Sequence, residues 1–260
     1  MSVNAFAYVN VFSIFGNGDL SSDDNRTPVS STNGRNLAIA KLVITYENDA
    51  VRGGTGFLIN NNTLVTAGHC MLLKDGNNVY EAKSIQMYFG VTGTNANHSY
   101  KYSRNIDENQ ISSHVFINSI FENTLKNEYS YVVENDYAYI KLPVALNLSK
   151  YFTLSNADLA ENKSEIQIIG YENHFQDTKF SNWTLLKDSD YIKDVYDEFF
   201  TTLAHGMPGQ SGSPVIDSNG NVVGIYTYGA NEGSHIDLEI YPDANNFCTR
   251  VTQSMINLIE

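Results

Sequence analysis

A serine, a histidine and an aspartate in this chain each occur in a sequence context that suits catalysis. Ser211 lies in the segment GQSGSP, between two glycines and just ahead of an apolar run, while His69 follows the stretch TLVTAG and Asp136 precedes YAYI. A serine hydroxyl is a weak nucleophile, so it needs a base within hydrogen-bond reach, and the base needs a group that orients it. These residues could therefore form a nucleophile, a base and an orienting carboxylate.

The order of these residues along the chain separates the known forms of this chemistry. The order here is His, Asp, Ser, as in chymotrypsin, whereas subtilisins begin with Asp and α/β-hydrolases begin with Ser. The hydrolase motif Gly-x-Ser-x-Gly also fails, because Ser213 stands where its last glycine belongs. The segments TAGHC, NDYAYIKL and GQSGSPV resemble the trypsin-like serine proteases, and more closely their bacterial glutamyl endopeptidase branch. The segment SDDNRT at 22–27 is similar to the region near the mature start of those enzymes, so the resemblance runs from about Leu20 to the C-terminus.

The resemblance implies a serine endopeptidase that works through an acyl-enzyme. Ser211 would be the nucleophile, His69 the base and Asp136 the group that holds the histidine tautomer, while the backbone N–H groups of Gly209 and Ser211 would form the oxyanion hole. Singly, a turn serine, a core histidine and a strand-capping carboxylate would explain the three side chains. Their joint occurrence in one order favours catalysis, and the resemblance gives Ser213, the rival nucleophile, a structural role.

The resemblance also places a specificity pocket before the nucleophile and on the segment 224–229. The predicted substrate-binding residues are His205, Gly206, Met207, Tyr226, Thr227, Tyr228 and Gly229. Glutamyl endopeptidases have a histidine where this chain has Tyr226, and Thr or Ser where it has Gly206. His205 could supply the missing cation, which favours cleavage after Glu or Asp. If its ring points away, the pocket would favour an apolar or aromatic side chain.

Composition excludes several other classes of protein. The chain has 260 residues, 42% hydrophobic, with a net charge of −13, which disfavours nucleic acid as a partner. No apolar run reaches the roughly 18 residues of a membrane span, so no membrane insertion is expected. The six histidines are dispersed, so we expect no metal and no cofactor. Protein or peptide substrates, a monomer and an extracellular location are expected.

Short strand-like segments separated by turns predict an all-β fold. Strands are expected over 37–46, 56–67, 85–91, 137–142, 165–170, 213–217 and 222–228, with a surface insertion containing a strand over 95–130. The turn DSNG should form a hairpin after the nucleophile segment. The apolar residues Phe247, Val251, Met255, Leu258 and Ile259 predict a C-terminal helix.

With the resemblance, this pattern implies two packed six-stranded antiparallel β-barrels of the chymotrypsin-like type, followed by that helix. Residues 1–20 would be a pro-segment or N-terminal extension, 21–145 the first barrel with His69 and Asp136, and 146–260 the second barrel with Ser211. If the pro-segment is removed between Gly16 and Ser21, the chain from Met1 is a zymogen. The resemblance places the usual partner of Cys70 where this chain has Gly54. Cys70 and Cys248 could form one disulfide, but two buried thiols are the favoured expectation.

Two other functions remain open from the sequence. The first is a catalytically silent binding module with a protease fold, against which the presence of all three triad residue types argues. The second is a serine hydrolase acting on esters, because the same acyl chemistry serves both bond types.

Overall fold

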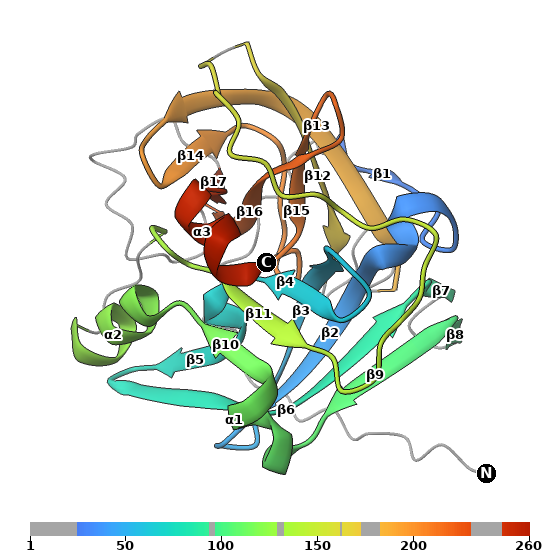
Figure 1. The fold of residues 1–260 in the computed structure, drawn as a ribbon, viewed down its shortest axis with the longest axis vertical. Helices are drawn as coiled ribbons and strands as arrows, with labels where there is room; N and C mark the ends of the chain where they lie inside the picture. Colours follow the sequence, from blue (N-terminus) through green and yellow to red (C-terminus); the bar gives the residue numbers. More distant parts are fainter. Residues whose placement is uncertain (1–24, 94–96, 129–132, 162, 173–182, 230–245) are drawn as a thin grey trace.

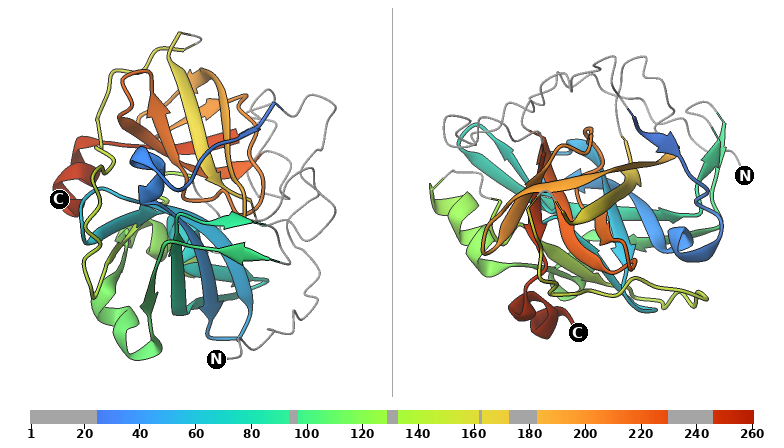
Figure 2. Two further views of the ribbon diagram at one scale, coloured as in Figure 1. Left: turned by 90° about the vertical axis from the view of Figure 1, so that its right-hand side faces the viewer. Right: turned by 90° about the horizontal axis from the view of Figure 1, so that it is seen from above.

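The computed structural model describes residues 25–93, 97–128, 133–161, 163–172, 183–229 and 246–260. It consists mainly of β-strands in two stacked bodies, one from each half of the chain, with a short helix at the end (Figures 1 and 2). The strands are β1 (Thr27–Pro28), β2 (Ile39–Tyr46), β3 (Val51–Leu58), β4 (Thr63–Thr66), β5 (Leu72–Asp75), β6 (Asn78–Phe89), β7 (Thr92–Gly93), β8 (His98–Ser99), β9 (Tyr102–Ile106), β10 (Val115–Ile117), β11 (Ala138–Lys141), β12 (Glu165–Tyr171), β13 (Leu185–Val195), β14 (Phe199–Thr202), β15 (Pro214–Asp217), β16 (Val222–Gly229) and β17 (Asn246–Arg250). The helices are α1 (Ile111–His114), α2 (Ser119–Glu128) and α3 (Gln253–Ile259), with 3₁₀ turns at Gly34–Ala38, Gly68–Cys70 and Glu108–Gln110.

The second half of the chain forms a closed barrel. Its strands run in the order β13-β12-β15-β16-β17-β14, and β14 pairs back with β13, while the short β1 adds to the outside of β13. The first half forms the sheet β10-β11-β4-β3-β2-β6-β5, to which β9 adds through β6. Among the described strands this first sheet does not close, so it is a half-barrel. The predicted chymotrypsin-like double barrel is confirmed.

The largest hydrophobic core crosses from one barrel to the other. It joins first-sheet residues such as Leu42, Phe57 and Ile140 to second-barrel residues such as Tyr171 and Ile225. Helix α3 belongs to the same core through Met255 and Ile259. Because both barrels bury apolar surface against each other, their facing loops are held in fixed relative positions.

The predicted C-terminal helix was wrong in its first half. Phe247 lies in strand β17, whose residues pair with β14 and β16, and only Gln253–Ile259 is helical. Phe247 and Val251 are spaced like a helix face, but sheet pairing with distant strands decides the backbone there. Thr252 ends the strand region and caps the helix, since its side chain accepts a hydrogen bond from Met255 N at 3.2 Å.

The expected insertion at 95–130 contains a helix that the sequence analysis missed. The segment contains β8, β9 and β10, so a strand is present as predicted, but α2 follows β10 and is begun by Asn118, whose Oδ1 accepts hydrogen bonds from Ile120 N and Phe121 N. Phe121 and Leu125 are four residues apart and both buried. An asparagine followed by this spacing is the signal that should have predicted a helix.

Most other strand predictions are confirmed with small shifts. The expected strand over 56–67 is two strands, β3 and β4, which form a tight antiparallel pair. The DSNG turn connects β15 to β16, and Gly220 there has a positive φ of 83°. The strands β13 and β14 were missed. No helix of the described residues is long and apolar enough to cross a membrane.

Candidate active site

His69 and Asp136 form a tightly bonded pair at the interface between the barrels. The His69 Nδ1 atom lies 2.7 Å from Asp136 Oδ2, and the His69 backbone N–H donates to Asp136 Oδ1 at 2.8 Å. The Asp136 side chain is fully buried and the His69 side chain is 11% exposed. A buried carboxylate in both contacts holds the Nδ1 edge of the histidine ring and leaves Nε2 as the ring nitrogen available for proton transfer.

A strained turn aims Asp136 at the histidine. Asn135 has a positive φ of 60°, a conformation that asparagine tolerates better than most residues. Its side chain donates to Glu198 Oε2 at 2.6 Å, which ties the turn to the second barrel. Strand β11 begins two residues after Asp136 and pairs with β4, the strand that leads to His69.

The loop that carries Ser211 is bonded to the first sheet. Thr55 N donates to the Ser211 carbonyl at 2.9 Å, and Thr55 Oγ1 donates to the Gly209 carbonyl at 2.9 Å. Gly212 has a φ of 87°, and a Cβ atom there would lie 2.1 Å from the Thr55 carbonyl oxygen. Only glycine fits this position, so the residue after Ser211 allows the loop to approach β3 directly.

Ser211 is linked to the residues next to His69 and next to the ring that stacks on it. Its carbonyl accepts a hydrogen bond from the thiol of Cys70 at 3.6 Å, and its hydroxyl donates to the Thr227 carbonyl at 3.2 Å. The next residue on β16, Tyr228, stacks on the His69 ring. Within the described residues, the Ser211 hydroxyl bonds to this carbonyl and not to His69. Rotation about the Ser211 χ1 angle would have to redirect the hydroxyl, and such bonds often form only when substrate is present.

The amides of Gly209 and Ser211 are not hydrogen-bonded to any described residue. By contrast, Gln210 N donates to Met207 O, and Gly212 N donates to Tyr226 O. Gly209 adopts a φ of 94°, which glycine accommodates without strain. Two backbone donors with no partner among the described residues, one on each side of Gln210, are compatible with an oxyanion hole.

Ser213 is not available as a nucleophile. Its side chain is fully buried, and its hydroxyl donates to the Gln210 carbonyl. A Cβ atom at Gly170 would overlap the Ser213 hydroxyl, so this hydroxyl is packed tightly against β12. Ser213 therefore supports the loop and does not face solvent.

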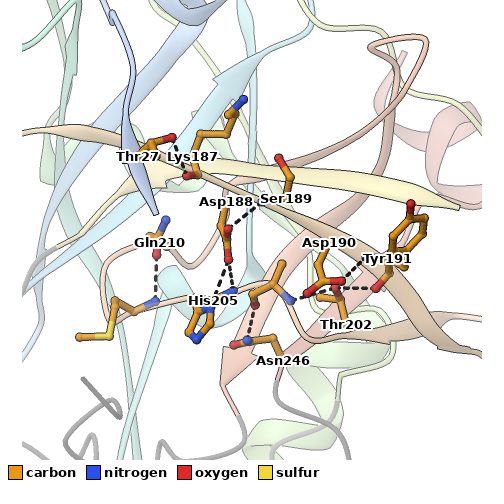
Figure 3. Close-up of polar contacts among 12 residues, drawn as sticks. Thr27, Lys187, Asp188, Ser189, Asp190, Tyr191, Thr202, His205, Gln210 and Asn246 are labelled. Carbon is orange, nitrogen blue, oxygen red and sulfur yellow. Dashed lines mark hydrogen bonds and ion pairs between the residues drawn. The ribbon is translucent and has the colours of Figure 1, made fainter. Parts of the chain in front are cut away.

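His205 is held by an aspartate that the sequence analysis did not single out. Asp188 Oδ2 accepts the His205 backbone N–H at 2.5 Å and lies 3.3 Å from His205 Nδ1 (Figure 3). Asp188 is 6% exposed, whereas the His205 side chain is 30% exposed. This arrangement repeats the two contacts that Asp136 makes with His69. The polar run around Asp188 gave no sign of it, because such runs normally indicate solvated strand positions.

The other predicted pocket residues are mostly buried. Tyr226 is fully buried, and its hydroxyl donates to Asn246 Oδ1 at 2.8 Å. Gly206 is packed against it, since a Cβ atom there would lie 2.2 Å from the Tyr226 hydroxyl oxygen. Met207 and Thr227 are also buried, and Gly229 ends β16. Of these residues, His205 has the most accessible side chain that can form a charged hydrogen bond.

Both cysteines are free thiols, as predicted. Cys70 and Cys248 are buried and not joined. Burial, with the charge of Asp136 adding to it, raises the pKa of Cys70 to about 12. Burial alone raises the pKa of Cys248 still further. No group of three His, Cys, Asp or Glu side chains among the described residues is placed to hold a metal ion.

The double barrel is the fold of chymotrypsin-like proteases, and comparison with known proteins agrees with this class. The family model of the trypsin-like peptidase domain matches residues 54–225, which is more than half of the chain. The chain belongs to this family.

Individual relatives are more distant. A curated protein of Bacillus subtilis (strain 168), named an extracellular metalloprotease, is 48% identical over 54 residues, which is 20% of this chain and only 17% of that protein. A solved Glu endopeptidase in complex with MPD has a TM-score of 0.66 at 20% identity and covers 92% of this chain and 96% of its own. HL collagenase has a TM-score of 0.65 at 18% identity over 90% and 96% of the two chains. An inactivated protease paralogue from the scabies mite has a TM-score of 0.59 at 18% identity over 86% and 93%. These three structures share the fold.

Proposed function

We propose that this chain is a serine endopeptidase that cleaves peptide bonds through an acyl-enzyme, with Ser211, His69 and Asp136 as its triad. The observation that carries the proposal is the double contact between His69 and a fully buried Asp136, together with the bond from Cys70, the residue after His69, to the Ser211 carbonyl. His69 would accept the Ser211 proton as the hydroxyl attacks the substrate carbonyl, and would then pass it to the leaving amine. The amides of Gly209 and Ser211 would receive the oxyanion.

The same proposal includes a preference for cleavage after Glu or Asp. His205 is the accessible cation candidate of the pocket, and Asp188 fixes its orientation. An imidazolium that donates from Nε2 to a substrate carboxylate would make a charge-assisted hydrogen bond. One structural neighbour is named a Glu endopeptidase, which supports this preference.

The proposal also places the enzyme outside the cell, with residues 1–20 removed before full activity. One relative is named as extracellular, which supports this location. N-terminal sequencing of an active preparation tests the processing, because an active form that retains Met1 would contradict it.

The experiment that tests the function maps peptide cuts by mass spectrometry in a denatured protein mixture. The wild-type chain, Ser211→Ala and Ser213→Ala are compared, each with and without residues 1–20. We expect cuts after Glu and Asp that disappear in Ser211→Ala and persist in Ser213→Ala. His205→Leu should retain cutting but lose the acidic preference by about tenfold or more, as expected for loss of a charged contact.

A catalytically silent binding module is the second candidate. It is favoured by one observation, the Ser211 hydroxyl bonded to Thr227 O and not to His69. A structural neighbour named an inactivated protease paralogue is consistent with a protease fold that persists without activity. A fluorophosphonate probe distinguishes the two, because only an activated Ser211 becomes labelled.

A further inference from the structure

Tyr228 covers one face of the His69 ring. The two ring centroids lie 4.6 Å apart with an angle of 28° between the planes, a stacked arrangement. Tyr228 is 6% exposed, so its ring is buried between the histidine and the body of the protein. The sequence analysis placed Tyr228 in the specificity pocket, but this contact is with the proposed base itself.

The position of Tyr228 is fixed by packing within the second barrel. It belongs to a small apolar cluster with Val133, Phe199 and Phe247, which is separate from the main core. The pairing of β16 with β17 also shifts register between Tyr226 and Tyr228. A local irregularity of this kind redirects a side chain, and here Tyr228 is the residue that follows it.

Asp136 and Tyr228 restrict different motions of the histidine. Asp136 bonds to the edge of the ring through Nδ1, and a hydrogen bond at one edge holds that edge but resists rotation of the ring plane only weakly. A flat contact on the ring face opposes that rotation. Both restraints are needed to hold Nε2 at one position, because small errors in orientation reduce catalysis strongly.

The stacking contact also favours the protonated form of His69, which arises during the proposed reaction. When the base takes the proton from the serine hydroxyl it becomes an imidazolium, and a cation is attracted to the face of an aromatic ring. Tyr228 therefore interacts more strongly with the protonated histidine than with the neutral one. An interaction that strengthens as the reaction proceeds lowers the barrier and does not merely bind substrate.

We propose that Tyr228 is a positioning residue for His69, which holds the plane of the imidazole by ring stacking and stabilises its protonated form during acyl transfer. The inference rests on the proposed serine endopeptidase function. The positioning role requires an aromatic ring at position 228 and does not require the tyrosine hydroxyl.

The test compares Tyr228→Phe, Tyr228→Leu and the control Phe152→Leu, which removes a buried ring that packs on Phe57. Fluorophosphonate labelling rates and the kcat and KM for a small ester are measured. We expect Tyr228→Leu to lower kcat and the labelling rate about tenfold with KM nearly unchanged, while Tyr228→Phe should retain wild-type values to within about twofold. Phe152→Leu should reduce stability without this loss.

Proton NMR of the resting protein is a second measurement, and its main result comes from the wild-type chain. The ring current of Tyr228 should move the His69 ring C–H resonances upfield, and Tyr228→Phe should keep this shift. Absence of the shift would overturn the inference, as would a Leu variant with wild-type kcat or a loss confined to KM. If the wild-type chain itself fails to label at Ser211, the proposed function fails first and the positioning role fails with it.

Discussion

Thr55 is the side chain through which the first sheet holds the loop before Ser211. Its hydroxyl donates to the Gly209 carbonyl at 2.9 Å and accepts the Tyr171 backbone N–H at 3.0 Å. One hydroxyl therefore links β3, β12 and the residue that supplies a proposed oxyanion donor. Loss of that hydroxyl leaves two buried backbone groups without a partner.

The first prediction is that Thr55→Val impairs both stability and activity. The free energy of unfolding should fall by about 1–3 kcal/mol, the usual cost of an unpaired buried polar group. The kcat for peptide cleavage should also fall, because the Gly209 amide is no longer held in place. Urea unfolding and steady-state kinetics measure the two effects. Thr55→Ser is the matched control, since it keeps the hydroxyl, and equal kcat in the Val and Ser variants would contradict the prediction.

The buried thiol of Cys70 leads to a second prediction at the same scale. Because burial and the charge of Asp136 raise its pKa to about 12, it carries almost no thiolate at pH 8, and thiolate is the reactive form. The native chain should therefore not react with a thiol-specific disulfide reagent at pH 8, while the denatured chain should react at both cysteines. Rapid reaction of one equivalent in the native state would show that the site opens more readily than this structure implies.

Site residues differ in how well the sequence reveals them. Ser211, His69 and Asp136 occur in local motifs, so their types and order were enough to single them out. Asp188 and Thr55 act through contacts between segments distant in the chain, and their own sequence surroundings look like ordinary strand. Such partners are defined by the sheet topology, which local pattern does not specify.

At the scale of elements, predictions were also correct where local sequence decides the structure and wrong where contacts between distant segments decide it. The strands β12, β15 and β16 are short apolar runs bounded by turns, and their local signal agreed with the structure. Strand β17 was predicted wrongly because its apolar spacing also suits a helix, and pairing with β14 and β16 decides between the two. Local preference predicts an element well only where distant pairing does not oppose it.

Gly54 on β3 provides a prediction about how two elements are joined. A Cβ atom at Gly54 would lie 3.2 Å from Cys70 Sγ, close to the roughly 3 Å between Sγ and the opposite Cβ in a disulfide. The introduced thiol of Gly54→Cys should therefore form a disulfide with Cys70 and connect β3 to the turn that carries His69. Closing a loop of this length should stabilise the fold by about 3 kcal/mol.

Thermal unfolding with and without reductant, together with thiol titration of the unfolded chain, measures this effect. Gly54→Ser is the control for the added side chain. If the bridge forms, Cys248 is the one thiol of the variant that still titrates without reductant. If all three cysteines titrate, β3 and the His69 turn do not approach as the structure has them.

At the scale of the whole molecule, a buried cluster of charges lies where the two barrels meet. Lys41 on β2 donates to the Glu172 carbonyl at 3.2 Å and lies over the rings of Trp183 and Tyr171. The Glu172 carboxylate pairs with Arg26 at 3.0 Å. Burial lowers the pKa of Lys41 to about 7, although the charge of Glu172 opposes this effect.

This pKa makes the stability of the assembled barrels depend on pH. The unfolded chain binds a proton at Lys41 up to about pH 10.5, whereas the folded chain releases it near pH 7. Between these values the unfolded state holds the extra proton, so the contribution of Lys41 to stability rises with pH, by at most about 1.4 kcal/mol per pH unit. Below pH 7 both states are protonated and the contribution is constant at its lowest value.

Lys41→Met should remove this dependence, because methionine has similar length and no charge. Urea unfolding of the wild-type chain and the variant at several values between pH 6 and pH 10 gives the difference in the free energy of unfolding. We expect the free energy of unfolding of the variant, relative to that of the wild type, to be highest near pH 6–7. It should then fall steadily toward pH 10. Loss of the hydrogen bond from Lys41 to the Glu172 carbonyl adds a cost that does not change with pH, so the slope of the difference, and not its absolute value, isolates Lys41. A difference that stays constant across this range would mean that Lys41 is solvated, and that the barrel interface is less dry than the shared core implies.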